Sequence, residues 1–137
     1  NGWVALATDF PVEDINPFKT FLASVARKDS QNYPENGFQK ENALTREQTL
    51  RGMTIWAAKS VFQEKERGSL EVGKNADFII LNQDLMKIDE KDILKTNVLE
   101  TWVDGTKSYY NQKYFDDLAK KLSGRAVSLD IIEAKAK

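Results

Sequence analysis

The chain has 137 residues, a formal net charge of −1, and neither cysteine nor histidine. Its length suits one domain, and its 41% hydrophobic content argues against intrinsic disorder. Without cysteine there is no disulfide, thiolate nucleophile or cysteine-ligated zinc. Without histidine there is no imidazole base and no complete histidine-based metal centre within this chain.

The balanced charge gives no reason to expect nucleic acid or an anionic membrane surface as a partner. No apolar run reaches the ~20 residues that a membrane-spanning helix needs, so no membrane partner is expected either. The lack of cysteine slightly favours a cytoplasmic location, and the compartment otherwise stays open.

The N-terminal part is predicted to form a strand followed by a helix. Residues 3–8 are a continuous apolar run, which is typical of a strand buried on both faces of a parallel sheet, and Pro11 ends it. Asn16 and Pro17 supply a helix N-cap and a proline at the first helical position. Apolar residues then recur at helical spacing as far as Val25, which completes the predicted βα unit.

A second helix is predicted after a long loop. Residues 31–44 show no periodicity and contain proline and glycine, so they are interpreted as that loop. Thr45 and Gln48 have the spacing of a capping box, and the apolar stripe behind them continues to Val61. One helix is therefore expected over this stretch.

The chain becomes rich in turns and short strands from residue 68 onward. Residues 78–81 predict a short buried strand, and residues 98–103 and 106–110 predict two more. Asp104-Gly105 between the last two is a strong two-residue hairpin signal.

Two further helices are predicted in the C-terminal half. A short one, capped by residues 89–92 (DEKD), is expected to run through Leu94. A longer one carries apolar residues at helical spacing over 115–122 and is expected to end at Gly124.

Two segments resemble the amidohydrolase superfamily, in particular amidohydrolase family 3. Residues 7–13, ATDFPVE, are similar to the end of the last barrel strand in that family. Residues 68–81, GSLEVGKNADFIIL, are similar to the segment that leaves the barrel and enters a small β-sandwich. The stretch from Glu41 through Ala58 also looks like the last helical region of the family, so the resemblance spans about residues 4–110.

The resemblance implies an α/β fold: the terminal piece of a TIM barrel, with its last strand and helices, plus part of a small β-sandwich. Residues 1–67 are accordingly assigned to the end of the (β/α)8 barrel and residues 68–110 to the β-sandwich-like subdomain. Residues 111–137 are assigned to a C-terminal helical tail. A full barrel takes about 250 residues, so the chain is interpreted as the C-terminal portion of a longer protein.

The second of these segments is interpreted as architecture, because its residues suit turns rather than chemistry. Gly68 and Gly73 permit tight turns that are expected to place Leu70 and Val72 inward. Asp77 is expected to accept backbone hydrogen bonds at the entry to the strand that follows.

Asp9 is the candidate catalytic residue and the candidate metal ligand. It follows the first predicted strand, and barrel enzymes carry their active groups at the C-terminal ends of strands. A carboxylate there can bind a divalent metal or accept a proton from water bound to that metal. In the resembled family the aspartate at this point has both roles. Without the resemblance, the sequence favours a turn or a cap for the next helix as the role of Asp9.

Four other residues have two interpretations each. Glu13 and Asp14 would lie near the barrel mouth, but they also suit the solvated start of a helix. Tyr109 and Tyr110 suggest stacking on a ligand, but they also suit packing on an edge strand.

The resemblance implies a parent enzyme that hydrolyses an amide or another non-peptide C–N bond of a small-molecule substrate. The water molecule that attacks this bond would be activated by zinc or another divalent metal. The family's His-x-His pair and its other histidines are missing here, so this chain alone is expected to be inactive and to bind no metal. Its expected partner is the N-terminal part of the same protein.

The alternative hypothesis is a non-catalytic interaction module that associates through exposed strand edges. Both hypotheses predict self-association.

Overall fold

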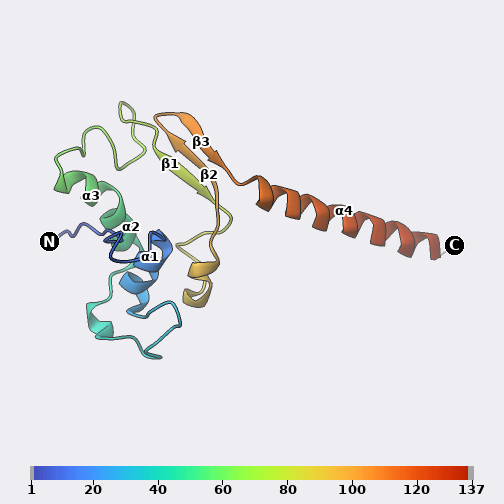
Figure 1. The fold of residues 1–137 in the computed structure, drawn as a ribbon, viewed down its shortest axis with the longest axis horizontal. Coiled ribbons are helices and arrows are strands. Elements are labelled where there is room, and N and C mark those ends of the chain that lie inside the picture. The colour runs from blue at the N-terminus through green and yellow to red at the C-terminus, as the bar shows by residue number, and fades with distance from the viewer. Residues whose placement is uncertain (1, 136–137) are drawn as a thin grey trace.

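A computed structural model describes the backbone of residues 2–135 and the side chains of residues 2–123. In chain order the elements are α1 (Pro17–Ala26), the 3-10 helix η1 (Lys40–Asn42), α2 (Arg46–Met53), α3 (Ile55–Ser60), β1 (Phe78–Leu81), η2 (Glu90–Lys95), β2 (Val98–Val103), β3 (Thr106–Tyr110) and α4 (Gln112–Lys135). The three strands form one antiparallel sheet in the order β1-β2-β3. Figure 1 shows α1, α2 and α3 gathered to one side of the sheet, with α4 leading away from it.

The core forms where α1 packs against η2. As predicted, the Asn16 side chain caps α1 by accepting a hydrogen bond from the Phe18 N–H at 3.0 Å. The apolar stripe of α1 then buries Phe21 and Leu22 against Ile93 of η2, which is fully buried. The core thus contains residues from both parts of the chain assigned above, the end of the barrel (1–67) and the β-sandwich-like subdomain (68–110).

Two cations fasten the loops around α1 by donating to backbone carbonyls. The guanidinium of Arg46 donates to the carbonyl oxygens of Leu85 and Ile88, and the Lys40 ammonium donates to that of Val25 at 3.0 Å. These bonds satisfy carbonyls that no helix or strand partner would otherwise reach. The Lys40 bond holds the loop before α2 against the end of α1, and the Arg46 bonds hold the segment after β1 against the start of α2.

The capping box at the start of α2 is confirmed. The Gln48 N–H donates to the Thr45 hydroxyl at 3.1 Å, and the Thr45 N–H donates to the Gln48 side-chain oxygen at 2.9 Å. Replacing Thr45 with alanine removes one of these bonds, so Thr45→Ala is expected to lower the free energy of unfolding by about 1 kcal/mol. Urea denaturation checks this. Thr106→Ala, at an exposed position of the hairpin, is the control and is expected to change it by less than about 0.5 kcal/mol.

The prediction of a single helix after Thr45 is wrong in one respect, because the helix breaks at Thr54. Thr54 leaves the helical region, with φ −125° and ψ −96°, and its hydroxyl donates to the Leu50 carbonyl at 2.7 Å. Gly68 lies close to this break: a Cβ placed on it would be 2.9 Å from the Ile55 Cα. The backbone of a distant turn therefore occupies the space beside the junction.

The prediction of a buried strand at residues 3–8 is also wrong for this chain. The segment is extended but exposed along much of its length, and it lies over α2, where the Leu6 N–H donates to the Gly52 carbonyl at 3.0 Å. A strand needs a neighbouring strand to pair its backbone. Within residues 2–135 the sheet contains β1, β2 and β3 and offers this segment no place.

The turn after α3 is confirmed in its backbone but not in its packing. Gly68 and Gly73 have φ values of +90° and +93°, as tight turns require. Leu70 and Val72 are nevertheless exposed, at 68% and 108%, where an inward position was predicted. The middle of β1 is also half exposed rather than buried. In the described part of the chain no element covers these apolar side chains.

The hairpin at the end of the sheet follows the prediction closely. Asp104 and Gly105 both have positive φ and connect β2 to β3. The Asp77 carboxylate accepts a hydrogen bond from the Asp104 N–H at 2.8 Å, which ties the entry of β1 to this turn. Asp77 therefore has the backbone-accepting role expected of it.

The last helix is longer than predicted. Gly124 does not end α4, which continues to Lys135. A single glycine costs a helix only about 1 kcal/mol, and helix-forming residues flank this one on both sides. Residues 136–137 lie outside the described residues. Among residues 2–135, no helix has both the length and the apolar character to cross a bilayer.

Candidate active-site groove

The polar face of α1 forms the floor of an open groove of about 510 Å³. Because α1 turns its apolar face to the core, its residues 19–20 and 23–24 lie on the other face and line the groove, together with residues 27–28, which follow the helix. Ala23 and Ser24 are small and leave space there. The rest of the lining comes from residues 7–9, 13–14 and 29–30.

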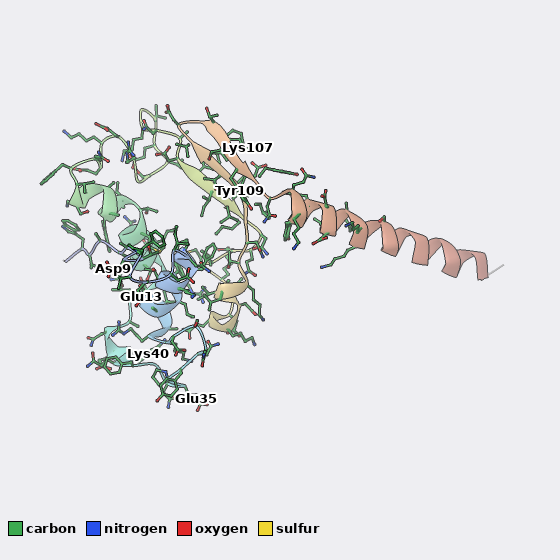
Figure 2. The ribbon with its side chains drawn as sticks, in the orientation of Figure 1. Asp9, Glu13, Glu35, Lys40, Lys107 and Tyr109 are labelled. Atoms are coloured by element: carbon green, nitrogen blue, oxygen red, sulfur yellow. The ribbon has the colours of Figure 1, made fainter. Side chains whose placement is uncertain are left out.

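Asp9 lies in this groove, on an exposed turn that follows the extended N-terminal segment. It has a φ of +57°, which aspartate tolerates better than most residues, and its carbonyl accepts from the N–H groups of Val12 and Glu13 at 2.9 and 3.3 Å. Figure 2 shows Asp9 and Glu13 close to each other beside α1. No hydrogen bond or ion pair with the described residues occupies the carboxylate of Asp9 or that of Glu13.

Asp14, in contrast, is fully engaged at the start of α1. Its carboxylate contacts the Lys19 ammonium at 2.7 Å and accepts from the Asn16 N–H at 2.9 Å. The hydrogen bond from Lys19, helped by the one from Asn16, lowers the pKa of Asp14. Of the two interpretations given for Asp14, the structure supports the helix start.

The pKa of Asp14 leads to a test by pH titration. Because its pKa is lower in the folded chain than in the unfolded chain, the pair with Lys19 stabilises the fold above the unfolded-state pKa. That contribution disappears as the pH falls through the folded-state pKa. A carbon-detected NMR titration should show the Asp14 midpoint below the ordinary aspartate value, and Lys19→Met should raise it. An unchanged midpoint in Lys19→Met would contradict the assignment.

The groove supplies part of a metal site at most. Carboxylate oxygens are suitable ligands for divalent cations, and Asp9 and Glu13 both have theirs available. Among the described residues, however, no group of three or more aspartate, glutamate, histidine or cysteine side chains is arranged to hold a metal ion. The two carboxylates are therefore suitable ligands for a divalent metal, but two ligands are too few to form a complete site.

Two cations that line the groove, Arg27 and Lys28, were not predicted from the sequence. Arg27 caps α1 with a φ of +57°, and the backbone N–H of Phe38 donates to its carbonyl at 2.8 Å. The only sign in the sequence is a pair of cations directly after the last apolar residue of the α1 stripe. Such pairs also occur simply because cations suit a helix C-terminus.

The aromatic residues on the sheet pack against one another rather than around a cavity. Trp102 stacks on Phe78 with ring centroids 5.6 Å apart, and Tyr110 stacks on Phe115 at 4.8 Å. Lys107 lies over both Trp102 and Tyr110, at 5.1 and 5.2 Å from their ring centroids. For Tyr110 the packing interpretation therefore holds.

Comparison with known proteins gives a family match and several similar proteins. Residues 1–109 match the sequence profile of the amidohydrolase family. The chain is 31% identical over 106 residues to N-substituted formamide deformylase of Arthrobacter pascens, a match covering 77% of this chain and 19% of that protein. It is 33% identical over 109 residues to Protein LONG AFTER FAR-RED 3 of Arabidopsis thaliana, covering 80% of this chain and 18% of the relative.

Two further matches are more distant. The chain is 26% identical over 98 residues to the putative amidohydrolase YtcJ of Bacillus subtilis, covering 72% of this chain and 18% of that protein. A solved amidohydrolase from Thermotoga maritima is 25% identical with a TM-score of 0.43, covering 52% of this chain and 17% of the solved one.

The chain belongs to the amidohydrolase family, in the region that family 3 defines, which confirms the resemblance found in the sequence. It spans about a fifth of the length of the curated relatives it matches. The family match ends at residue 109, so α4 lies beyond it.

Proposed function

We propose that the chain is the C-terminal part of a metal-dependent hydrolase that cleaves amide or other non-peptide C–N bonds. The observation that carries the proposal is the unengaged carboxylate of Asp9, which lines an open groove in a chain of amidohydrolase sequence. Residues 3–8 would be the last strand of a TIM barrel, lacking its neighbours here. The exposed apolar segment and the exposed Leu70 and Val72 support this, because all of them need covering polypeptide.

Asp9 would contribute one oxygen ligand to a divalent metal such as zinc. When bound, such a metal lowers the pKa of a coordinated water toward about 7. The Asp9 carboxylate would accept the proton of the attacking water and return it to the leaving nitrogen. Glu13 adds negative charge that attracts a cation to this end of the groove.

The remaining metal ligands would come from polypeptide outside this sequence, since the chain has no histidine. This part alone would therefore be inactive and would hold a metal only weakly. The name of the Arthrobacter relative, a deformylase of N-substituted formamides, describes cleavage of a C–N bond. That agrees with the reaction class proposed here.

Paramagnetic relaxation by Mn²⁺ tests the metal-binding role on the chain itself. In 15N-HSQC spectra, small additions of Mn²⁺ are expected to broaden amide signals around Asp9 and Glu13 first. Asp9→Asn should remove that preference, whereas Asp104→Asn, the same change on the exposed hairpin, should leave it intact. Broadening at the groove that survives Asp9→Asn would count against Asp9 as a ligand.

The exposed sheet supports the alternative of an interaction module, and it also suits docking of the N-terminal part of the same protein. β1 and β3 are both edge strands, every residue of β3 is exposed, and Ile79 and Ile80 of β1 are half exposed. We propose that a second copy covers these edges when no other polypeptide is present. Size-exclusion chromatography with light scattering should then show dimers or larger species that Ile79→Lys weakens. A monodisperse monomer would contradict self-association.

A further inference from the structure

Gly52, in the last turn of α2, is buried beneath the extended segment that leads to Asp9. Its φ lies outside the left-handed region, so the backbone conformation at this position does not require glycine. A glycine inside a helix also lowers the stability of the helix relative to an alanine. For α2 by itself, alanine would therefore be the more stable residue.

The space beside Gly52 is filled by the extended segment. A Cβ placed on Gly52 would lie 2.9 Å from both Cγ and Cδ1 of Leu6 and 2.9 Å from the carbonyl oxygen of Val4. These distances are shorter than van der Waals contact, and the Val4 oxygen belongs to the backbone. The segment would therefore have to move to admit a methyl group at this position.

The same close approach forms the hydrogen bond that holds the segment on α2. The Leu6 N–H donates to the Gly52 carbonyl at 3.0 Å. Within residues 2–123, no other backbone hydrogen bond joins residues 2–8 to the rest of the chain. The Lys59 ammonium lies 5.0 Å from the centroid of the Trp3 ring, at the end of the segment away from Asp9. On the N-terminal side of Asp9, the bond to Gly52 is thus the nearest backbone attachment.

Asp9 lies between this attachment and the start of α1. Leu6 comes three residues before Asp9, and Asn16, which caps α1, comes seven residues after it. The turn between them is closed on itself, because the Asp9 carbonyl accepts from the N–H groups of Val12 and Glu13. A displacement at Leu6 would therefore move the whole turn, and the Asp9 carboxylate with it, relative to α1.

We infer that Gly52 is a positioning residue for Asp9: by admitting residues 4–6 against α2, it fixes where the Asp9 carboxylate lies in the groove. Ligand distances in metal sites are fixed to within about 0.2 Å, so a shift too small to unfold the chain is enough to disturb such a site. That the position of Asp9 serves a metal rests on the proposed function. The attachment of the segment by Gly52 does not, and it requires no metal.

Gly52→Ala and Gly2→Ala make the same chemical change with different expected results. A Cβ on Gly2 would meet nothing within 4 Å. In hydrogen–deuterium exchange followed by 15N-HSQC, Gly52→Ala is expected to speed exchange of the Leu6 amide at least about tenfold, because the amide loses its acceptor. Gly2→Ala should change that rate by less than about twofold. An unchanged Leu6 exchange rate in Gly52→Ala would overturn the inference.

Mn²⁺ reports where the Asp9 carboxylate lies relative to α1. Paramagnetic broadening falls steeply with distance, so the ratio of broadening at the Ala23 amide to that at the Glu13 amide depends on how Asp9 lies against the helix. Gly52→Ala is expected to shift this ratio, whereas Gly2→Ala should leave it unchanged. A role of Gly52 in stability alone would change the denaturation midpoint without shifting the ratio.

A second pair of variants removes the hydrogen bond from the side of the segment. Leu6→Pro deletes the N–H donor and leaves α2 intact, so it serves as the test if Gly52→Ala does not fold. It is expected to shift the broadening ratio as Gly52→Ala does. Ala5→Pro introduces the same residue at a position whose N–H makes no backbone hydrogen bond within residues 2–123, and it should leave the ratio unchanged. Equal ratios in Leu6→Pro and Ala5→Pro would overturn the inference.

Asp9→Asn in the parent chain separates this inference from the proposed function. If Gly52→Ala speeds exchange at Leu6 while Mn²⁺ ignores Asp9, the metal role fails and Gly52 still fixes the segment that carries Asp9. If Mn²⁺ selects Asp9 while Gly52→Ala changes neither the exchange rate nor the broadening ratio, the inference fails and the proposed function stands.

Discussion

Phe21→Ala is expected to lower the free energy of unfolding by about 3–5 kcal/mol. Phe21 is 1% exposed and lies where α1 meets η2, so the substitution leaves a cavity that its neighbours fill only in part. Since domains of this size are stable by only about 5–15 kcal/mol, most of the stability would be lost. Urea denaturation followed by circular dichroism measures the change.

Phe62→Ala is the matched control, because Phe62 is 91% exposed and buries little area in this chain. Its effect should stay within about 0.5 kcal/mol. Similar losses in both variants would mean that the core does not lie between α1 and η2. The groove would then lack the rigid helix on which its geometry depends.

Asp9→Asn in the complete hydrolase is expected to lower kcat/KM by about 10²–10⁴-fold. An amide cannot accept a proton from water as a carboxylate does, and it is a weaker metal ligand. Steady-state kinetics, together with the metal content of the purified protein, measures both consequences.

Asp14→Asn makes the same chemical change in the same groove, at a carboxylate already engaged by Lys19. It is expected to alter kcat/KM much less than Asp9→Asn does. If the two substitutions have equal effects, Asp9 has no special role in the reaction. Loss of metal in Asp14→Asn alone would point to a different ligand.

The features predicted correctly from the sequence are those that a few neighbouring residues determine. The Asn16 cap, the capping box of Thr45 with Gln48, and the turn at Asp104 each depend on hydrogen bonds within or next to one short segment. Residue types at fixed spacing are enough to specify such bonds. Distant parts of the chain do not alter them.

The features predicted wrongly depend on polypeptide that lies far along the chain or, under the proposed function, in the rest of a longer protein. An apolar run such as residues 3–8 becomes a strand only when another strand is there to pair with it. Leu70 and Val72 turn inward only when something covers them. The break at Thr54 coincides with the close approach of Gly68, which no local pattern reveals.

The sequence pointed to the acidic end of the candidate site, at Asp9, Glu13 and Asp14, and it did so through resemblance to a family. Arg27 and Lys28 enter the site because the polar face of α1 meets residues 7–14 and because Phe38 holds the arginine. Their charges in the sequence are equally typical of a helix end. Only the three-dimensional arrangement distinguishes the two interpretations.

The most direct measurement is a crystal structure of the complete protein with zinc, with the metal located by anomalous scattering. We expect an Asp9 carboxylate oxygen to lie about 2.0–2.2 Å from the zinc ion, with the other ligands supplied by the N-terminal part. A zinc ion held entirely by other residues, with the Asp9 carboxylate directed away from it, would contradict the role proposed for Asp9.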